Sequence, residues 1–486
     1  MEVEDYGFCG GGYTPQSSIA DPNLLMNLYT EIIQDPFSQK TRRILLSTPG
    51  TSVFANAGSG PIRGALLWNG LLYVVSRNEV YSITSAAVVT QMTGTVAYAT
   101  NSPVSMSASD DQMLIISVGL GYILSSSTVT QIADGDFPAS VLDGAYVDGY
   151  FLVVTSASCF FSAVDNGTSW DALDFFTVQA SQSALVGIRV INQEPWIFCG
   201  EVVQPFSNTG ATDIPFEPIR SATIPHGCAA AASIGEMNGN AVWLMSDAQG
   251  SNSVIRAVGY DAQRVSNHAV EFALSGYTTI SDAVAYVYQD QGHTFYVLSF
   301  PDADATHVYD ETTNEWHQRS YRNPSTGILG AHISINHQFC FGKHLVGSRS
   351  GRAIYELKLP TQAADATVTF GDDGGDILLR RRRCALPWTF GKRVFVDCLT
   401  FLVEPGLGTP SGQGLTPTLM VRMSFDGGKT WGNERTVSAG AMSAFAGYFP
   451  RLWRWGSGMQ PVVEVSMTDP IPWRFLGATA VLEAEP

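Results

Sequence analysis

The sequence has few charged residues and no long apolar segment. Asp, Glu, Lys and Arg make up 15% of its 486 residues, and only five residues are lysines. No apolar run approaches the ~18 residues that a membrane-spanning helix needs. The acidic start, Met1 to Asp5, lacks the basic and apolar regions of a secretory signal peptide. We therefore expect synthesis in a cytoplasm and no membrane insertion by this chain.

Metal-ligand and cofactor motifs are also missing. The seven cysteines are scattered and never spaced C-x-x-C, which favours reduced thiols and argues against a zinc site. The eight histidines show no H-E-x-x-H or other metal-ligand spacing. The glycines at 10–12 are not followed by Lys-Ser/Thr, and no G-x-S-x-G motif occurs. We expect no metal, no cofactor and no catalytic residues.

Positive charge is scarce and unevenly placed. The formal net charge is −17, and residues 1–360 carry all of it, with 15 basic and 32 acidic side chains. Residues 361–486 carry 12 of each sign. Tight binding to a phosphate backbone needs excess cations that displace the DNA counterions. Sequence-specific DNA binding is therefore not expected.

Apolar residues and turn formers are abundant. Hydrophobic residues make up 45% of the chain, which is enough for a large core and argues against disorder. The chain also has 47 glycines and 24 prolines. This composition favours many short strands joined by tight turns and excludes a long-helix protein.

A unit of two apolar strands recurs between residues 62 and 358. Its first strands are Leu71–Val75, Met113–Ser117, Tyr150–Val154, Pro195–Cys199, Ala241–Met245, Thr294–Leu298 and His344–Gly347. The spacing of 38–53 residues is typical of a β-propeller blade, which buries its faces only by stacking on neighbouring blades. We predict an all-β chain with a six- or seven-bladed propeller over 61–360. A long irregular β-sandwich remains the alternative.

Two further segments flank the repeats. Residues 1–60 are interpreted as an N-terminal arm with one strand, because three prolines leave no room for a long helix. A boundary is expected at 361–376, in an acidic, glycine-rich stretch. Strands expected at about 393–403, 417–425, 461–467 and 474–484 predict a C-terminal antiparallel β domain over 361–486, which we expect to be sandwich-like.

One motif has the form of the Asp box of sialidase propellers, S-x-D-x-G-x-T-W. Its defining residues here are Ser424, Asp426, Gly428, Thr430 and Trp431. The functional interpretation is a glycosidase. The structural interpretation is a hairpin turn in which Asp426 binds backbone amides and Trp431 packs below it. We favour the structural one, because sialidases carry several boxes and this copy lies outside the repeats.

A single basic run stands out, formed by Arg380, Arg381, Arg382 and Arg383. It is short for a nucleic-acid patch and has no interleaved aromatic residues. The acidic residues Asp372, Asp373 and Asp376 precede it. We expect the run to form salt bridges within the molecule or with an adjoining subunit, at a domain or subunit interface.

Several short motifs occur in an order that resembles one protein family. They are Asn27-Leu28-Tyr29-Thr30-Glu31, Ser47-Thr48-Pro49-Gly50, Ile62-Arg63-Gly64, Trp170 to Phe175, Thr209 to Phe216, Pro225-His226-Gly227, Ser424 to Trp431, Gly447-Tyr448 and Arg451 to Gly456. Together they resemble the packaged-DNA stabilisation proteins of short-tailed phages, the tail hub or nozzle family. The match runs along almost the whole chain.

The resemblance implies a structural virion protein, made in the cytoplasm of a bacterial host and built into a phage tail. Such a protein forms a homo-oligomeric ring, hexameric in relatives, below the portal and its adaptor, with a tail needle, tailspikes or fibres attached. It retains packaged DNA and conducts it during ejection, without sequence-specific binding. The alternative is a glycan-binding or glycan-hydrolysing, sialidase-like tail protein.

Overall fold

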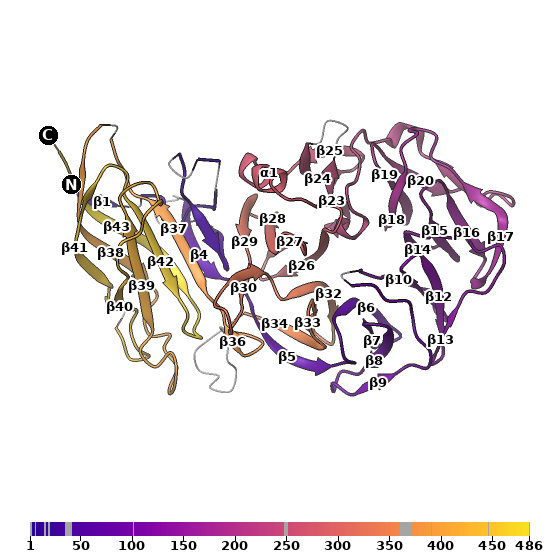
Figure 1. Cartoon of the computed structure of the whole chain (residues 1–486), viewed down its shortest axis with the longest axis horizontal. Coiled ribbons are helices and arrows are strands. Elements are labelled where there is room, and N and C mark those ends of the chain that lie inside the picture. Colours follow the sequence, from indigo (N-terminus) through magenta and orange to yellow (C-terminus); the bar gives the residue numbers. More distant parts are fainter. Residues whose placement is uncertain are drawn as a thin grey trace.

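The computed structural model describes residues 2–4, 6–13, 16–17, 20–34, 41–100, 102–246, 251–359, 372–389, 391–445 and 447–485. Within these ranges the chain is almost entirely β-structure, with one α-helix, α1 (His268–Ser275), and two short 3-10 turns, η1 (Arg220–Ala222) and η2 (Ala231–Ser233). Figure 1 shows a ring of sheets at one end of the long axis and two packed sheets at the other. No helix in the described ranges has the length and apolarity needed to cross a bilayer.

The ring is a seven-bladed β-propeller with four antiparallel strands per blade. The first strands of the blades are β6 (Ile62–Trp68), β10 (Ser105–Ala108), β14 (Asp143–Val147), β18 (Leu185–Ile191), β22 (Gly235–Met237), β26 (Val284–Asp290) and β32 (Ser334–Cys340). The second strands are β7 (Leu71–Ser76), β11 (Met113–Ser117), β15 (Tyr150–Val154), β19 (Glu194–Cys199), β23 (Asn240–Ser246), β27 (His293–Phe300) and β33 (Lys343–Ser348). The third strands are β8 (Glu79–Ile83), β12 (Leu120–Ser125), β16 (Cys159–Ala163), β20 (Val203–Asn208), β24 (Asn252–Val258), β28 (Ala305–Asp310) and β34 (Ala353–Lys358). The outer strands are β9 (Val89–Gln91), β13 (Thr128–Gln131), β17 (Asn166–Phe176), β21 (Phe216–Pro218), β25 (Asp261–Arg264), β29 (Glu315–Gln318) and β5 (Gly50–Asn56).

The propeller expected from the repeat is confirmed, and the irregular sandwich is not what forms. The seven segments expected as first strands are the second strands of the seven blades. The true first strands face the propeller axis, and their half-buried residues, as in β10, give no continuous apolar signal. The second strands are buried on both faces by neighbouring blades, so their apolar runs stand out in the sequence.

The seventh blade is completed by the N-terminal part of the chain. β5 pairs antiparallel with β34, with Ala353 opposite Asn56 and Leu357 opposite Thr51. The outer strand of the last blade therefore comes from residues that precede the first blade. This pairing joins the two ends of the repeat region, so the ring of blades is closed by strand hydrogen bonds as well as by packing.

The C-terminal domain is a β-sandwich that includes most of the N-terminal segment. One sheet contains β1 (Glu2–Glu4), β3 (Leu28–Gln34), β4 (Thr41–Ser47), β43 (Arg474–Ala484), β38 (Val394–Val403) and β41 (Arg451–Gly458). The other contains β2 (Leu24–Met26), β37 (Arg380–Ala385), β42 (Val462–Met467), β39 (Thr418–Ser424) and β40 (Arg435–Ser438). Their shared core includes Phe8, Leu28, Phe401 and Phe475.

Residues 1–60 thus differ from the single-stranded arm expected from the sequence. Their described part holds five strands, β1 to β4 in the sandwich and β5 in the propeller. Local propensity gave little sign of this, because β1, β2, β4 and β5 all pair with strands more than 290 residues away, and β3 alone pairs only with its neighbour β4. Residues 361–371, where we expected the domain boundary to begin, lie outside the described residues.

β2 joins the two domains into one nine-stranded sheet. Its Met26 pairs in parallel with Gln318 of the sixth blade and antiparallel with Arg381 of β37. Two smaller elements lie close to this junction, the hairpin of β30 (Ser320–Arg322) and β31 (Leu329–Ala331) and the hairpin of β35 (Asp372–Asp373) and β36 (Asp376–Ile377). β35 also pairs with β5, so the chain bridges the domains at several points.

Candidate functional site

The four consecutive arginines lie on β37 in the interior of a sandwich sheet, between β2 and β42. An extended backbone sends alternate side chains to opposite faces. Arg380 and Arg382 are fully buried inside the sandwich, whereas Arg381 and Arg383 are half-buried on its outer face. The run is therefore two pairs of arginines with different surroundings.

The inward-facing arginines bind backbone carbonyl groups. Arg382 donates from Nε to the carbonyl oxygen of Phe8 at 2.7 Å and from Nη2 to Oδ1 of Asn23 at 3.1 Å. Arg380 donates from Nη1 to the carbonyl oxygen of Ile471 at 2.5 Å. Each guanidinium holds several N–H donors in a fixed plane. It can therefore donate to loop carbonyl groups that have no partner in a β-sheet. Arg382 thereby ties the N-terminal segment to the C-terminal sheet.

The outward-facing arginines share one buried carboxylate, that of Glu464 on β42. Its side chain is 2% exposed, and its oxygens lie 2.8 Å from Nη2 of Arg383, 2.6 Å from Nη2 of Arg422 and 3.5 Å from Nε of Arg381. Glu464 stands opposite both Arg383 and Arg422 in the strand register. Three guanidinium groups thus surround a single carboxylate, and burial lowers the pKa of Arg381.

The acidic turn before the run has other contacts. The side chains of Asp372 and Asp373 lie outside the described residues. Asp376 accepts a hydrogen bond from the hydroxyl of Tyr321 in the propeller-side hairpin. The ion pairs recorded for the arginine run are made with Glu464.

The Asp-box hairpin follows β39 and is held by its own side chains. Oδ1 of Asp426 accepts hydrogen bonds from Oγ of Ser424 at 2.7 Å and from the amides of Lys429 and Thr430 at 2.9 Å each. Oδ2 accepts from Oγ1 of Thr430 at 2.5 Å. These hydrogen bonds, first the one from the Thr430 hydroxyl, hold the pKa of Asp426 well below its ordinary value. Gly428 has φ of 91°, which favours glycine.

Trp431 brings the two predicted sites together. The guanidinium carbons of Arg383 and Arg422 lie 4.9 and 4.8 Å from its ring centroid, so the indole packs on the arginine pair that binds Glu464. The ring is half-buried at the surface of the sheet, not enclosed beneath the hairpin. Ser424, Asp426 and Thr430 hold the hairpin by their mutual hydrogen bonds, and through Trp431 the hairpin forms a cap over Arg383 and Arg422.

A surface hollow of about 780 Å³ lies beside this cap. We call it the Arg–Trp groove, and its lining includes Arg393, Phe425, Trp431, Arg435, Arg454, Trp455 and Met459. The Arg435 guanidinium lies 4.6 Å from the ring centroid of Trp455 and donates to the carbonyl oxygen of Trp453 at 2.7 Å. Arg454 has φ of 59°, a left-handed conformation that is uncommon outside glycine.

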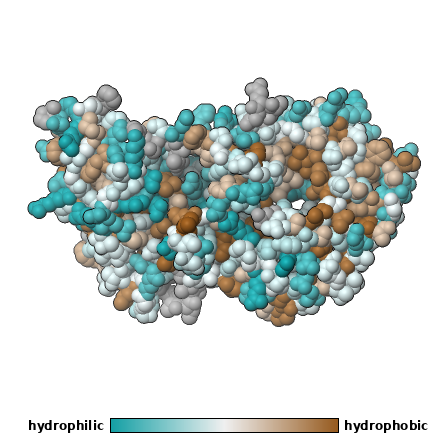
Figure 2. Space-filling view, in the orientation of Figure 1, coloured by the Kyte–Doolittle hydropathy of each residue, from teal (hydrophilic) through white to brown (hydrophobic). Residues whose placement is uncertain are grey.

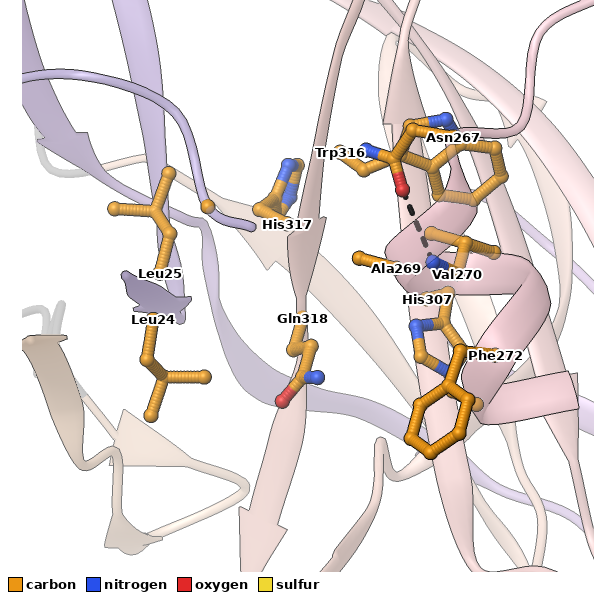
Figure 3. A pocket seen from close by; sticks show the side chains of 12 residues that line it. Leu24, Leu25, Asn267, Ala269, Val270, Phe272, His307, Trp316, His317 and Gln318 are labelled. Carbon is orange, nitrogen blue, oxygen red and sulfur yellow. Dashed lines mark hydrogen bonds between the residues drawn. The ribbon is translucent and has the colours of Figure 1, made fainter. Parts of the chain in front are cut away.

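A second hollow, of about 240 Å³, separates the domains beside the junction strand. Figure 3 shows Leu24 and Leu25 on one side of it and the helix residues Ala269, Val270 and Phe272 on the other. This lining is mainly apolar, although His307 and His317 contribute. Within the described part of the chain, no group of three or more His, Cys, Asp or Glu is placed to hold a metal ion. All seven cysteines are buried.

The propeller axis contains a cavity of about 570 Å³, lined by first strands such as β6, β14 and β26. That volume is in the range of small-molecule sites, about 300–1,000 Å³. Arg189, on its wall, is 2.7 Å from Asp143 of the neighbouring blade.

Two residues that the sequence did not mark as sites hold the fold together. Arg63 is buried between the first two blades, where its Nε donates to the carbonyl oxygen of Ser102 at 2.7 Å and its Nη2 to Oγ of Ser117 at 2.7 Å. Burial lowers its pKa to about 10. Asn27, directly after β2, binds the backbone of Ser320 and of Leu379. Both belong to motifs of the resemblance, which was the only signal for them.

Solved structures with a similar arrangement are distant from this chain in sequence. The extracellular domain of the one-component system BT4673 from B. thetaiotaomicron has 9% identity, a TM-score of 0.41 and coverage of 65% of this chain, which spans only 40% of that chain. BamB from Moraxella catarrhalis has 9% identity, a TM-score of 0.37 and coverage of 68% of this chain and 98% of its own. PorZ from Porphyromonas gingivalis has 10% identity, a TM-score of 0.37 and coverage of 80% and 46%.

No curated protein matches the sequence. A family model, described as bacteriophage P22 Gp10, beta-propeller, matches residues 22–362. The matched range begins at β2, includes β5 and all seven blades, and covers well over half of the chain. It confirms the resemblance seen in the short motifs, and the chain belongs to the bacteriophage P22 Gp10 family of β-propeller phage stabilisation proteins.

Proposed function

We propose that this structural phage protein forms the ring-shaped nozzle, or hub, of a short phage tail. In this proposal about six copies surround a conduit below the portal and adaptor, retain packaged DNA and conduct it during ejection. The family match supports a phage stabilisation protein. The central cavity of one propeller has the volume of a small-molecule site, so we place the DNA conduit between copies.

The observation that carries this proposal furthest is the charge distribution. Residues 1–360, which include the whole propeller, hold the entire net charge of −17. A conduit lined by carboxylates repels the DNA backbone and releases no counterions, so DNA can move without adhering. We propose that part of this acidic set faces the conduit, while other members serve solubility on the outer surface.

We further propose that the chain is not an enzyme. The sialidase-like alternative depends on Asp426, but hydrogen bonds from Ser424, Lys429 and Thr430 already occupy both oxygens of that carboxylate. A general acid or base must be free to exchange a proton with its substrate. The lowered pKa of Asp426 also keeps it ionised, which does not suit a general acid.

Particles that lack the chain test the proposal. We expect such particles to lose packaged DNA soon after filling, and we expect negative-stain images of the purified chain with its adaptor to show a ring. Particles that keep their DNA and eject it normally without the chain would contradict the proposed function. Hydrolysis of sialosides or host polysaccharide that disappears on Asp426→Asn would restore the enzyme alternative.

A further inference from the structure

The outer edge of the third blade carries an unusual combination of apolar and acidic side chains. β17 is an outer strand, and Leu173 on it is 79% exposed. Phe175 on the same strand and Ile214 on the following blade are also exposed. Exposed edge strands with apolar side chains promote association, so proteins usually cover or charge them.

Acidic residues accompany these apolar ones. Asp171 and Asp174 lie on β17, and Asp213 lies on the loop before β21. The two segments are packed together, because the rings of Phe176 and Phe216 are 5.6 Å apart. Burial raises the pKa of Asp174, as do the nearby carboxylates of Asp171 and Asp213. We call the set the β17 edge, comprising Asp171, Leu173, Asp174, Phe175, Asp213 and Ile214.

The Arg–Trp groove has the opposite charge and a matching apolar component. Arg393 and Arg454 form no ion pair within the described ranges, and Arg435 stacks on Trp455 without a carboxylate partner there. The carboxylate of Asp426, which also lines the groove, is engaged in its own hairpin. Met459 adds an apolar side chain that is 47% exposed. Groups of this kind, arginine with tryptophan, dominate protein interfaces.

The two surfaces lie at opposite ends of the molecule. Figure 1 places β17 at the far right of the propeller, and β40 and β41, which contribute to the groove, at the far left of the sandwich. Figure 2 shows hydrophobic side chains at the same right-hand end. One copy therefore cannot bring its own edge into its own groove. A contact between unlike surfaces of successive copies closes into a ring when the rotation between copies allows it.

We infer that the Arg–Trp groove binds the β17 edge of a neighbouring copy of this chain. Asp171, Asp174 and Asp213 of one copy then face Arg393, Arg435 and Arg454 of the next, and Leu173 and Phe175 cover Met459 and Trp455. This inference rests on the proposed ring, and it adds the pair of surfaces that joins the subunits. An acidic surface of a second copy and an anionic glycan would both complement the charge of the groove. Only the second copy also buries the apolar side chains of the β17 edge, which favours it as the occupant.

Charge reversal on each surface provides the test. Arg435→Glu with Arg454→Glu makes both surfaces of a copy acidic, and Asp171→Arg with Asp174→Arg makes both basic. We expect each double variant alone to assemble at least tenfold more weakly than the wild type, as measured by analytical ultracentrifugation and by images with the adaptor. A 1:1 mixture of the two variants should assemble again, because unlike charges then meet at every contact.

Cross-linking gives a readout that does not depend on ring stability in solution. Because the natural cysteines are buried, a bis-maleimide should react only with introduced thiols. We expect Leu173→Cys chains to cross-link to Met459→Cys chains in assembled tails. They should not cross-link to Val258→Cys chains, although Val258 on β24 is as exposed as Met459, at 51% against 47%. Normal assembly of both charge variants without this cross-link would overturn the inference and leave the proposed function intact.

Two further outcomes separate the inference from its alternatives. Binding of the wild-type groove to a phosphorylated or uronic acid glycan, lost in Arg435→Glu with Arg454→Glu while assembly is unchanged, would overturn it in favour of glycan recognition. Particles that retain DNA without the chain would remove the proposed function, and the cross-link would then still decide whether copies meet through these surfaces.

Discussion

Asn27 and Ser320 bind each other through two hydrogen bonds across the junction between the domains. Nδ2 of Asn27 donates to the carbonyl oxygen of Ser320 at 2.8 Å, and Oδ1 accepts from the amide of Ser320 at 2.9 Å. Nδ2 also donates to the carbonyl oxygen of Leu379 at 2.8 Å. One buried side chain thus connects the residue after β2, the start of β30 and the segment that leads into the arginine run.

We predict that Asn27→Ala weakens this junction. The substitution leaves three buried backbone groups without partners, and each such group costs about 1–3 kcal/mol. Asn27 also has φ of 54°, which alanine tolerates poorly. The expected result is a lower free energy of unfolding in denaturant and faster amide exchange in β2, measured by hydrogen–deuterium exchange.

Asn69→Ala is the matched control, because Asn69 has φ of 48° but is exposed in a hairpin turn. It shares the backbone strain and lacks the buried partners. Equal destabilisation by the two variants would show that the strain, and not the hydrogen bonds to Ser320 and Leu379, accounts for the effect at Asn27.

Glu464→Gln should destabilise the sandwich strongly. The substitution removes the carboxylate that Arg381, Arg383 and Arg422 surround and leaves three half-buried cations side by side. Since hydrogen bonds to charged groups contribute about 1.5–3 kcal/mol, we expect a loss of at least that size. Glu404→Gln is the control, because its pair with Arg474 is partly exposed and is expected to contribute about 0–1 kcal/mol. Similar urea midpoints for the two variants would show that Glu464 is not the centre of the arginine cluster.

Closure of the propeller by β5 can be tested with two neighbouring positions. Ala55 is 6% exposed and Val53 is 50% exposed, although both lie on β5. We expect Ala55→Asp to bury an unpaired charge and to cost several kcal/mol, whereas Val53→Asp should be nearly neutral. Limited proteolysis should then cut the first or seventh blade of Ala55→Asp first. Uniform resistance of all blades would contradict closure through β5.

The elements visible in the sequence are those whose stabilising partners are local. The second strands of the blades pair with neighbours a few residues away and bury apolar runs, so they could be located with their approximate bounds. β37 could not be located, because four consecutive arginines are unusual in a buried strand. Their burial depends on distant partners, Phe8, Ile471 and Glu464.

The candidate site was visible only in separate pieces. The Asp box and the arginine run were both recognised from sequence, yet their contact through Trp431 depends on β37, β42 and β39 lying side by side. Strand order in a sheet is set by tertiary packing and not by spacing in the chain. Arg435 gave no signal, because single surface arginines are common, and Trp455 was visible only as part of the motif Arg451 to Gly456.

We predict that Trp431→Ala lowers the stability of the sandwich and leaves the propeller folded. The half-buried ring contacts Arg383 and Arg422, so we expect a loss of about 1–2 kcal/mol, less than the ~3–5 kcal/mol of a fully buried Trp. Asp426→Asn should unfold the hairpin. Like Trp431→Ala, it should leave the melting of the propeller unchanged, as followed by tryptophan fluorescence and proteolysis. Wild-type stability in both variants would contradict a structural role for the Asp box.

For Asp426 the direction of the pH dependence follows from its lowered pKa. A carboxyl group with a depressed folded pKa stabilises the fold fully above its ordinary pKa of 3.8, and this contribution is lost as the pH falls through the lower folded value. We therefore expect wild type and Asp426→Asn to converge in hairpin stability only in strong acid. A difference that disappears already between pH 5 and 7 would argue against these hydrogen bonds.

Three buried histidines should make the propeller sensitive to mild acid. Burial lowers the pKa of His307 to about 4 and that of His332 and His337 to about 3. The guanidinium groups of Arg319 and Arg349 lower the pKa of His332 further, and the neighbouring ring of His344 lowers that of His337. Since the unfolded chain binds these protons below about pH 6.5 and the folded chain does not, stability is complete above that pH and falls as the pH drops toward 4. Each histidine should contribute a slope of about 1.4 kcal/mol per pH unit in this window. His307→Gln should reduce the slope measured by urea unfolding at stepped pH, even if it lowers stability at pH 7. If the free energy of unfolding of the propeller is unchanged from pH 7 to 4.5, these rings are protonated or exposed to solvent within the folded state.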